Sequence, residues 1–161
     1  MVDSVDFAKI IINRTNVLNK SREEKIALGE TKLHKILYIC DGLLLATDSN
    51  IISENAKAWN YGPVYPRVNR WLKKEPDALE GNPNLNFNAF PAITADVIDL
   101  IDAVINKFGQ WTANRLSDWS HSPGSPWEMA LERGNGIMNS VIDKNDMKKY
   151  FRKTFSGSKK D

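Results

Sequence analysis

The chain has 161 residues, which fits one ordinary domain that buries roughly two-thirds of its unfolded surface. Its apolar fraction of 42% and charged fraction of 26% are close to globular averages and argue against a disordered or fibrous chain. The net charge of +2 is far below the dense basic surface of a dedicated nucleic-acid binder. We therefore expect a single domain over residues 1–155 and a disordered basic tail over residues 156–161.

The first half of the chain predicts three helices and a short β element. Asp3 or Ser4 can cap the first helix, and Thr31 can cap a second helix that is apolar on most sides. Residues 51–59 suit one short strand or a small hairpin. The Gly-Pro pair that follows stops the strand, and Pro63 suits the first turn of the third helix.

The second half begins with residues 76–91, whose glycine, prolines and asparagines predict the longest irregular and most mobile loop. Four helices follow, each starting after a side chain that can accept a bond from a free N–H group: Thr94, Thr112, Ser125 and Asp143. Gly109 is expected to end the first of them in a left-handed conformation, and residues 137–142 suit a second strand. The predicted fold class is mainly α, a compact cluster of six to seven helices with a two- or three-stranded β element.

The start of the chain lacks the basic and apolar regions of a secretory signal, and the apolar-rich run over residues 33–46 is too short to cross a bilayer. Cys40 is the only cysteine, so no internal disulfide can form and a buried thiol is expected. We therefore expect a cytoplasmic protein without membrane insertion.

Three segments carry a resemblance to a known family: Thr31–Tyr38 (TKLHKILY), Ala58–Val68 (AWNYGPVYPRV) and Leu116–Trp127 (LSDWSHSPGSPW). Together they resemble the Panacea domain, also called the SocA-like or GepA-like antitoxin family, which is often associated with bacterial phages and prophages. The resemblance spans nearly the whole chain. Where the family usually shows Leu-Gln-Lys-Leu-Leu-Tyr, this chain has His34 in place of the glutamine.

The resemblance implies an antitoxin of a type II toxin–antitoxin system. Members neutralise toxins by direct protein–protein contact, and at least one acts as a proteolytic adaptor. The implied partner is a cognate toxin protein, with a protease as the second partner if the chain is an adaptor. No enzymatic activity and no cofactor are implied.

The segment that carries the Trp-x-Tyr-Gly-Pro-Val run is also the source of the candidate partner-binding residues. Large, stiff aromatic side chains and arginine are enriched at interaction hot spots. The candidates are Trp59, Tyr61, Pro63, Tyr65, Arg67, Arg70 and Trp71. The alternative is that the aromatic residues pack in the core while Gly62 and Pro63 only shape a turn.

Two further hypotheses concern other classes of function. Arg67, Arg70, Lys73 and Lys74 form a basic stripe that could bind DNA in a phage-encoded regulator, although the small net charge argues against nucleic-acid binding as the primary function. His121 with Asp118 could support a cryptic hydrolase. The sequence contains no phosphate-binding glycine motif and no metal-ligand spacing, so we expect no catalytic set, no cofactor and no metal.

Overall fold

The computed structural model describes residues 1–156, which form seven α-helices and one small antiparallel sheet. The helices are α1 (Ser4–Asn19), α2 (Glu30–Ala46), α3 (Pro66–Lys74), α4 (Ala95–Phe108), α5 (Ala113–Ser120), α6 (Pro126–Arg133) and α7 (Lys144–Ser156). The strands are β1 (Lys57–Trp59), β2 (Gly62–Val64) and β3 (Ser140–Val141), and two 3-10 turns are η1 (Ala78–Glu80) and η2 (Phe87–Ala89). The predicted mainly α class is confirmed. The predicted tail lies outside the described residues, apart from Ser156, which ends α7.

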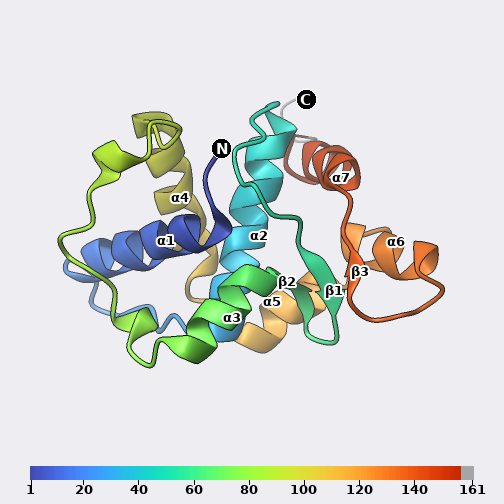
Figure 1. Cartoon of the computed structure of the whole chain (residues 1–161), viewed down its shortest axis with the longest axis horizontal. Helices are drawn as coiled ribbons and strands as arrows, with labels where there is room; N and C mark the ends of the chain where they lie inside the picture. The colour runs from blue at the N-terminus through green and yellow to red at the C-terminus, as the bar shows by residue number, and fades with distance from the viewer. Residues whose placement is uncertain (157–161) are drawn as a thin grey trace.

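Helix α2 forms the centre of the molecule. Figure 1 shows α1 and α4 on one side of it and α7 on the other, and α2 contacts each of these helices as well as α5 and β2. Almost every side chain from Leu33 to Leu45 is buried, as expected for a helix that is apolar all round. The prediction that Thr31 caps α2 is wrong, because the helix already begins at Glu30. The N-cap residue is Gly29, which has an extended backbone and offers no side chain to accept a bond.

Strands β1 and β2 form a tight hairpin, and β3 pairs with the other edge of β1. In the hairpin Ala58 is opposite Pro63 and Trp59 is opposite Gly62. The prediction that Pro63 begins the third helix is therefore wrong, and Pro66 occupies the first helical position instead. Proline is tolerated in β2 because this strand is at an edge of the sheet.

Side-chain caps fix the starts of five helices. Asp3 caps α1, and its Oδ1 accepts a bond of 2.8 Å from the Val5 N–H. The predicted caps of α4, α5 and α6 are confirmed at Thr94, Thr112 and Ser125. Gly109, however, has a right-handed φ of −61° after α4, so the predicted left-handed ending is wrong.

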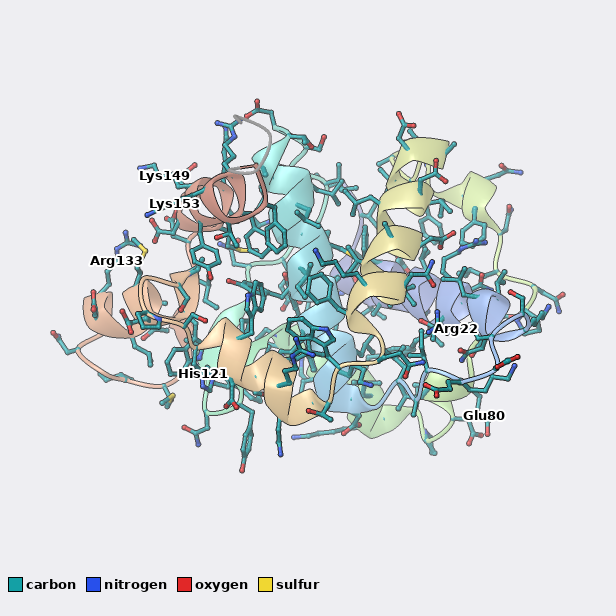
Figure 2. All side chains as sticks on the ribbon, turned by 180° about the vertical axis from the view of Figure 1, so that it is seen from behind. Arg22, Glu80, His121, Arg133, Lys149 and Lys153 are labelled. Carbon is teal, nitrogen blue, oxygen red and sulfur yellow. The ribbon has the colours of Figure 1, made fainter. Side chains whose placement is uncertain are left out.

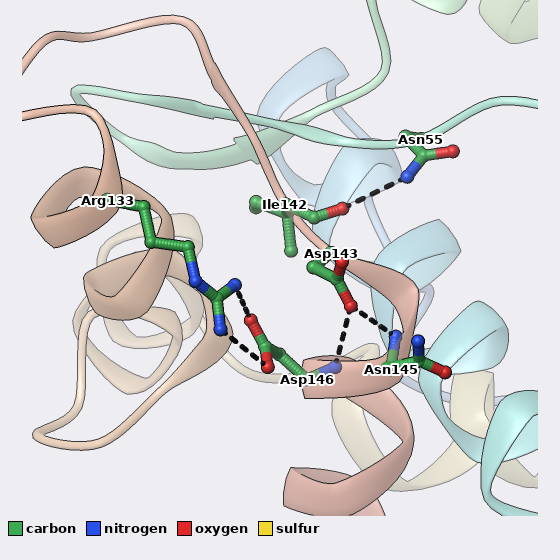
Figure 3. Close-up of polar contacts among 6 residues, drawn as sticks. All are labelled: Asn55, Arg133, Ile142, Asp143, Asn145 and Asp146. Atoms are coloured by element: carbon green, nitrogen blue, oxygen red, sulfur yellow. Dashed lines mark hydrogen bonds and ion pairs between the residues drawn. The ribbon is translucent and has the colours of Figure 1, made fainter.

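The cap of α7 is part of the junction between β3, α6 and α7, drawn in Figure 3. Asp143 Oδ1 accepts bonds from the N–H groups of Asn145 (2.7 Å) and Asp146 (3.2 Å). The Asp146 carboxylate pairs with Arg133 at the end of α6, and Asn55 Nδ2 donates to Ile142 O at 3.2 Å. These bonds hold the chain on both sides of β3 in place.

The loop over residues 76–91 lies against α1. Asn13 Nδ2 donates to Asn82 O at 3.1 Å, and Asn16 Nδ2 donates to Glu80 O at 2.9 Å. The loop is thus attached to the first helix at two of its backbone carbonyls. Over residues 1–156, no helix combines the length and the apolar character that a membrane span requires.

Candidate partner-binding site

The three segments that carry the family resemblance meet around the β1–β2 hairpin. Three hairpin carbonyls accept bonds from three different helices: Trp127 Nε1 of α6 donates to Trp59 O (2.8 Å), Ser117 Oγ of α5 donates to Tyr61 O (2.8 Å), and Lys35 Nζ of α2 donates to Pro63 O (3.3 Å). We call Lys35, Ser117 and Trp127 the hairpin clamp. A backbone held at alternate carbonyls has little freedom left, so the clamp fixes the tip of the hairpin.

Gly62 allows the hairpin to approach the clamp closely. Its φ of +112° is a conformation that residues with a side chain rarely adopt. A Cβ atom at this position would lie 2.5 Å from Ser120 Oγ and 2.8 Å from Lys35 Cε. The glycine in the Trp-x-Tyr-Gly-Pro-Val run is therefore explained by both backbone conformation and space.

Buried polar groups anchor the chain just after the hairpin. The Tyr65 N–H donates to His34 Nδ1 at 3.2 Å, and the Tyr65 hydroxyl donates to Asp41 Oδ2 at 2.8 Å. Burial raises the pKa of Asp41 to about 6, although Lys144 and the bond from Tyr65 act in the opposite direction. Burial lowers the pKa of Lys35 to about 8.

His34 must stay neutral in this arrangement, because its Nδ1 accepts a hydrogen bond. Burial, assisted by the charge of Lys35, lowers the pKa of His34 from 6.5 to about 3. A group with a lowered folded-state pKa binds fewer protons when folded, so its contribution to stability is complete above pH 6.5. That contribution is lost at about 1.4 kcal/mol per pH unit as the pH falls from 6.5 towards 3.

We therefore expect His34→Gln to reduce the acid sensitivity of the fold. Glutamine has a carbonyl oxygen that can accept from Tyr65 N–H and does not titrate. Between pH 7 and pH 5 the wild type should lose about 1 to 2 kcal/mol more unfolding free energy than the variant. Urea unfolding at both pH values measures this difference, and equal losses in the two proteins would contradict the buried, neutral histidine.

Tyr61 is the most exposed of the predicted aromatic contacts. It stands at the turn between β1 and β2 with 74% of its surface exposed, so the alternative that it packs in the core is wrong. Trp59 is half-buried, and its Nε1 donates to Asn139 Oδ1 at 2.9 Å. A hollow of about 400 Å³ lies beside them, lined by Trp59, Asn60, Tyr61, Met138 and Asn139.

Pro63 and Tyr65, in contrast, are buried and offer no surface to a partner. Tyr65 is completely inaccessible and belongs to the core. The hairpin segment of the predicted set is thus divided, with Tyr61 exposed and Pro63 and Tyr65 buried.

Arg67, Arg70 and Trp71 form a second surface on α3. They line a separate hollow of about 440 Å³ together with Asp3, Val5, Asp6 and Lys74. Arg67 pairs with Asp3, with 2.6 Å between Nη2 and Oδ2. The carboxylates of Asp3, which caps α1, and of Asp6 in its first turn therefore compensate part of the positive charge of the basic stripe on α3.

The residues of the hydrolase hypothesis lie at the edge of the clamp. His121 stacks on Trp127 with 4.0 Å between the ring centroids, and Figure 2 shows it at the end of α5. Burial and the charge of Lys35 lower the pKa of His121, whereas the charge of Asp118 raises it. Ser120 Oγ donates to Ser117 O at 2.7 Å and is buried. These contacts describe a packed junction of α5, α6 and the hairpin. Within residues 1–156, no three metal-ligating side chains gather into a group.

Several residues of this region are absent from the sequence-based set. Lys35 and Ser117 lie in two of the segments that carry the family resemblance, and that position is the sequence signal that could have identified them. Ile137, Met138 and Val141 are exposed by 66%, 41% and 54%. Residues 137–142 are predicted as a strand, whereas β3 comprises only Ser140–Val141, so Ile137 and Met138 lie in the turn before it.

Comparison with known proteins finds a family match over the residues that form this site. A family model described as Antitoxin SocA-like, Panacea domain matches residues 33–128, a range that contains the hairpin and all of the clamp. Antitoxin SocA of Caulobacter vibrioides is 28% identical over 127 residues, which cover 70% of this chain and 65% of that relative. No solved structure matches the chain. Because the family model covers more than half of its residues, the chain belongs to the Antitoxin SocA-like, Panacea domain family.

Proposed function

We propose that the protein is the antitoxin of a type II toxin–antitoxin pair and neutralises its toxin by direct contact, not by catalysis. Family membership supports the antitoxin role. The observation that carries the proposed mechanism is the clamped hairpin, which holds Tyr61 outward at 74% exposure. A large aromatic side chain on a rigid support is a favourable contact residue, because little conformational freedom is lost on binding.

The toxin-binding surface that we propose has two parts, Trp59 and Tyr61 at the hairpin and Arg67, Arg70 and Trp71 on α3. Pro63 and Tyr65 support this surface from inside. A protein partner agrees better with these residues than nucleic acid does, because Asp3 and Asp6 lie beside the arginines. The bound antitoxin would cover the active surface of the toxin and hold it inactive.

Co-expression tests the proposal. The probe is the product of a small reading frame adjacent to this gene, expressed in bacteria with and without the wild-type chain. We expect the neighbour alone to reduce colony counts and the pair to restore them. A lethal neighbour that the chain fails to neutralise would contradict the proposal.

The same experiment separates occlusion from proteolytic adaptation. An occluding antitoxin leaves the amount of toxin unchanged, whereas an adaptor lowers it by delivering the toxin to a protease. We propose occlusion, and the level of a tagged toxin on an immunoblot, with and without the antitoxin, distinguishes the two mechanisms.

A further inference from the structure

Exposed apolar side chains lie at the β1–β2 turn and along the segment that forms β3. Over the described residues, the large apolar side chains that are exposed are Met1, Val17, Tyr61, Ile137, Met138 and Val141. Tyr61 comes from the hairpin turn, Ile137 and Met138 from the segment that leads into β3, and Val141 from β3 itself. The bond between Trp59 Nε1 and Asn139 Oδ1 joins the two segments directly. We call Tyr61, Ile137, Met138 and Val141 the tip patch.

The backbone beneath the tip patch is ordered by its own hydrogen bonds. Gly136 N donates to Leu131 O at 2.7 Å, and Ile137 N donates to Gly134 O at 3.0 Å. Asn139, which has a positive φ of 77°, donates its N–H to Ala58 O at 2.7 Å. A turn built in this way keeps Ile137 and Met138 in solvent, although burial of such side chains stabilises a fold by roughly 1.5–3 kcal/mol each. Their exposure is the expected arrangement of a surface that a partner covers.

The hollow that shares Tyr61 and Met138 with the tip patch indicates the chemistry of that partner. None of its lining residues (Trp59, Asn60, Tyr61, Met138 and Asn139) is charged. An uncharged lining offers no compensation to a charged group that is removed from water, so it selects a neutral, apolar one. A cavity of about 150 Å³ holds one benzene ring, and the hollow of about 400 Å³ therefore has room for one or two large apolar side chains.

The position of the patch favours an extended segment as the occupant. In the order β2-β1-β3, strand β3 is at an edge of the sheet, where α6 contacts it and Val141 is exposed. An edge strand can be extended by another chain, with alternate side chains entering pockets beside it. A second copy of this chain is a poorer occupant, because stable interfaces engage about 20–30 residues on each partner. The hollow and the patch together comprise only seven: Trp59, Asn60, Tyr61, Ile137, Met138, Asn139 and Val141.

We propose that the tip patch binds an extended, uncharged apolar segment of the toxin, which runs along β3 and inserts a large apolar side chain between Tyr61 and Met138. This inference rests on the proposed antitoxin function and adds the toxin segment that the surface recognises. It assigns a contact role to Ile137, Met138 and Val141.

Neutralisation by a patch variant tests the proposal. The variant carries Ile137→Ser, Met138→Ser and Val141→Thr, all at exposed positions where substitutions change stability little. The matched control is Val17→Ser, an exposed apolar residue at the far end of α1. With the toxic product of the adjacent reading frame as the probe, we expect the patch variant to lose at least 10-fold in surviving colonies. The control should protect like the wild type, and thermal unfolding should confirm that both variants are folded.

The outcomes separate the two proposals. A folded patch variant that protects fully overturns the patch and leaves the antitoxin function intact. Failure of the wild type to protect overturns the antitoxin function itself, and with it a toxin segment as the occupant.

Crosslinking tests the nature of the occupant. Benzoylphenylalanine introduced at position 137 of the functional chain is irradiated in the complex, and the crosslinked peptide is identified by mass spectrometry. We expect one uncharged apolar stretch of the toxin. A crosslink to a charged stretch of the toxin, or to a second copy of this chain, would contradict the proposal.

Discussion

Tyr65→Ala is expected to lower the free energy of unfolding by about 3–5 kcal/mol, the usual range for removing a buried aromatic side chain. Tyr65 is inaccessible, and its hydroxyl donates to buried Asp41. The substitution leaves a cavity in the core. It also removes the hydrogen bond to the Asp41 carboxylate, which is buried and therefore cannot bond to water instead. Denaturant unfolding measures the loss.

Tyr61→Ala is the matched control, since it removes the same side chain four residues earlier. Tyr61 is 74% exposed, so the expected change in unfolding free energy is below about 0.5 kcal/mol. Equal losses in the two variants would contradict the division of the segment into a buried and an exposed part.

Gly62→Ala has the second large expected effect, a loss of about 2–3 kcal/mol. The positive φ of Gly62 strains any other residue by about 1–3 kcal/mol. The added methyl group also meets Ser120 Oγ and Lys35 Cε, both of which belong to buried side chains. Because the hairpin must then move away from the clamp, neutralisation should weaken together with stability.

Gly124→Ala isolates the contribution of the backbone. Gly124 also has a positive φ, of +77°, but a Cβ atom there would have no neighbour within 4 Å. We expect a loss of about 1 kcal/mol and unchanged neutralisation. If thermal and denaturant unfolding show the same loss of stability for both glycine variants, the close packing of Gly62 does not contribute to stability.

Local signals in the sequence were sufficient to predict most helices. Thr94, Thr112, Ser125 and Asp143 each accept bonds from the free N–H groups at a helix start, and such caps involve only neighbouring residues. The fold class followed because apolar residues at helical spacing dominate the chain.

The start of α3 could not be predicted in the same way. Pro63 and Pro66 both satisfy the backbone requirements of a first helical position. The choice between them depends on the pairing of β2 with β1 and on the bond from Lys35, which lies 28 residues away. Single-sequence reasoning contains no information about such distant contacts.

The candidate site could be predicted only in part, because it too depends on contacts between residues that are distant in the sequence. Tyr61 and Tyr65 are equivalent by composition, and only the partners of the second, His34 and Asp41 of α2, determine which of them is buried. The apolar residues that precede β3 were missed as candidates because exposure is a property of the assembled fold. The motif therefore identified a segment of candidate contact residues but did not separate the buried residues of that segment from the exposed ones.

Direct binding tests the central claim, that a folded antitoxin acts through contact at the hairpin. Isothermal titration calorimetry of the purified chain with the product of the adjacent toxic reading frame provides the measurement. We predict a saturable complex with the wild type and a Kd raised about 30-fold or more by Tyr61→Ala, the effect expected of a hot-spot residue that costs about 2 kcal/mol when truncated. A wild-type chain that protects cells but forms no complex, or a folded Tyr61→Ala variant with unchanged Kd, would contradict the account.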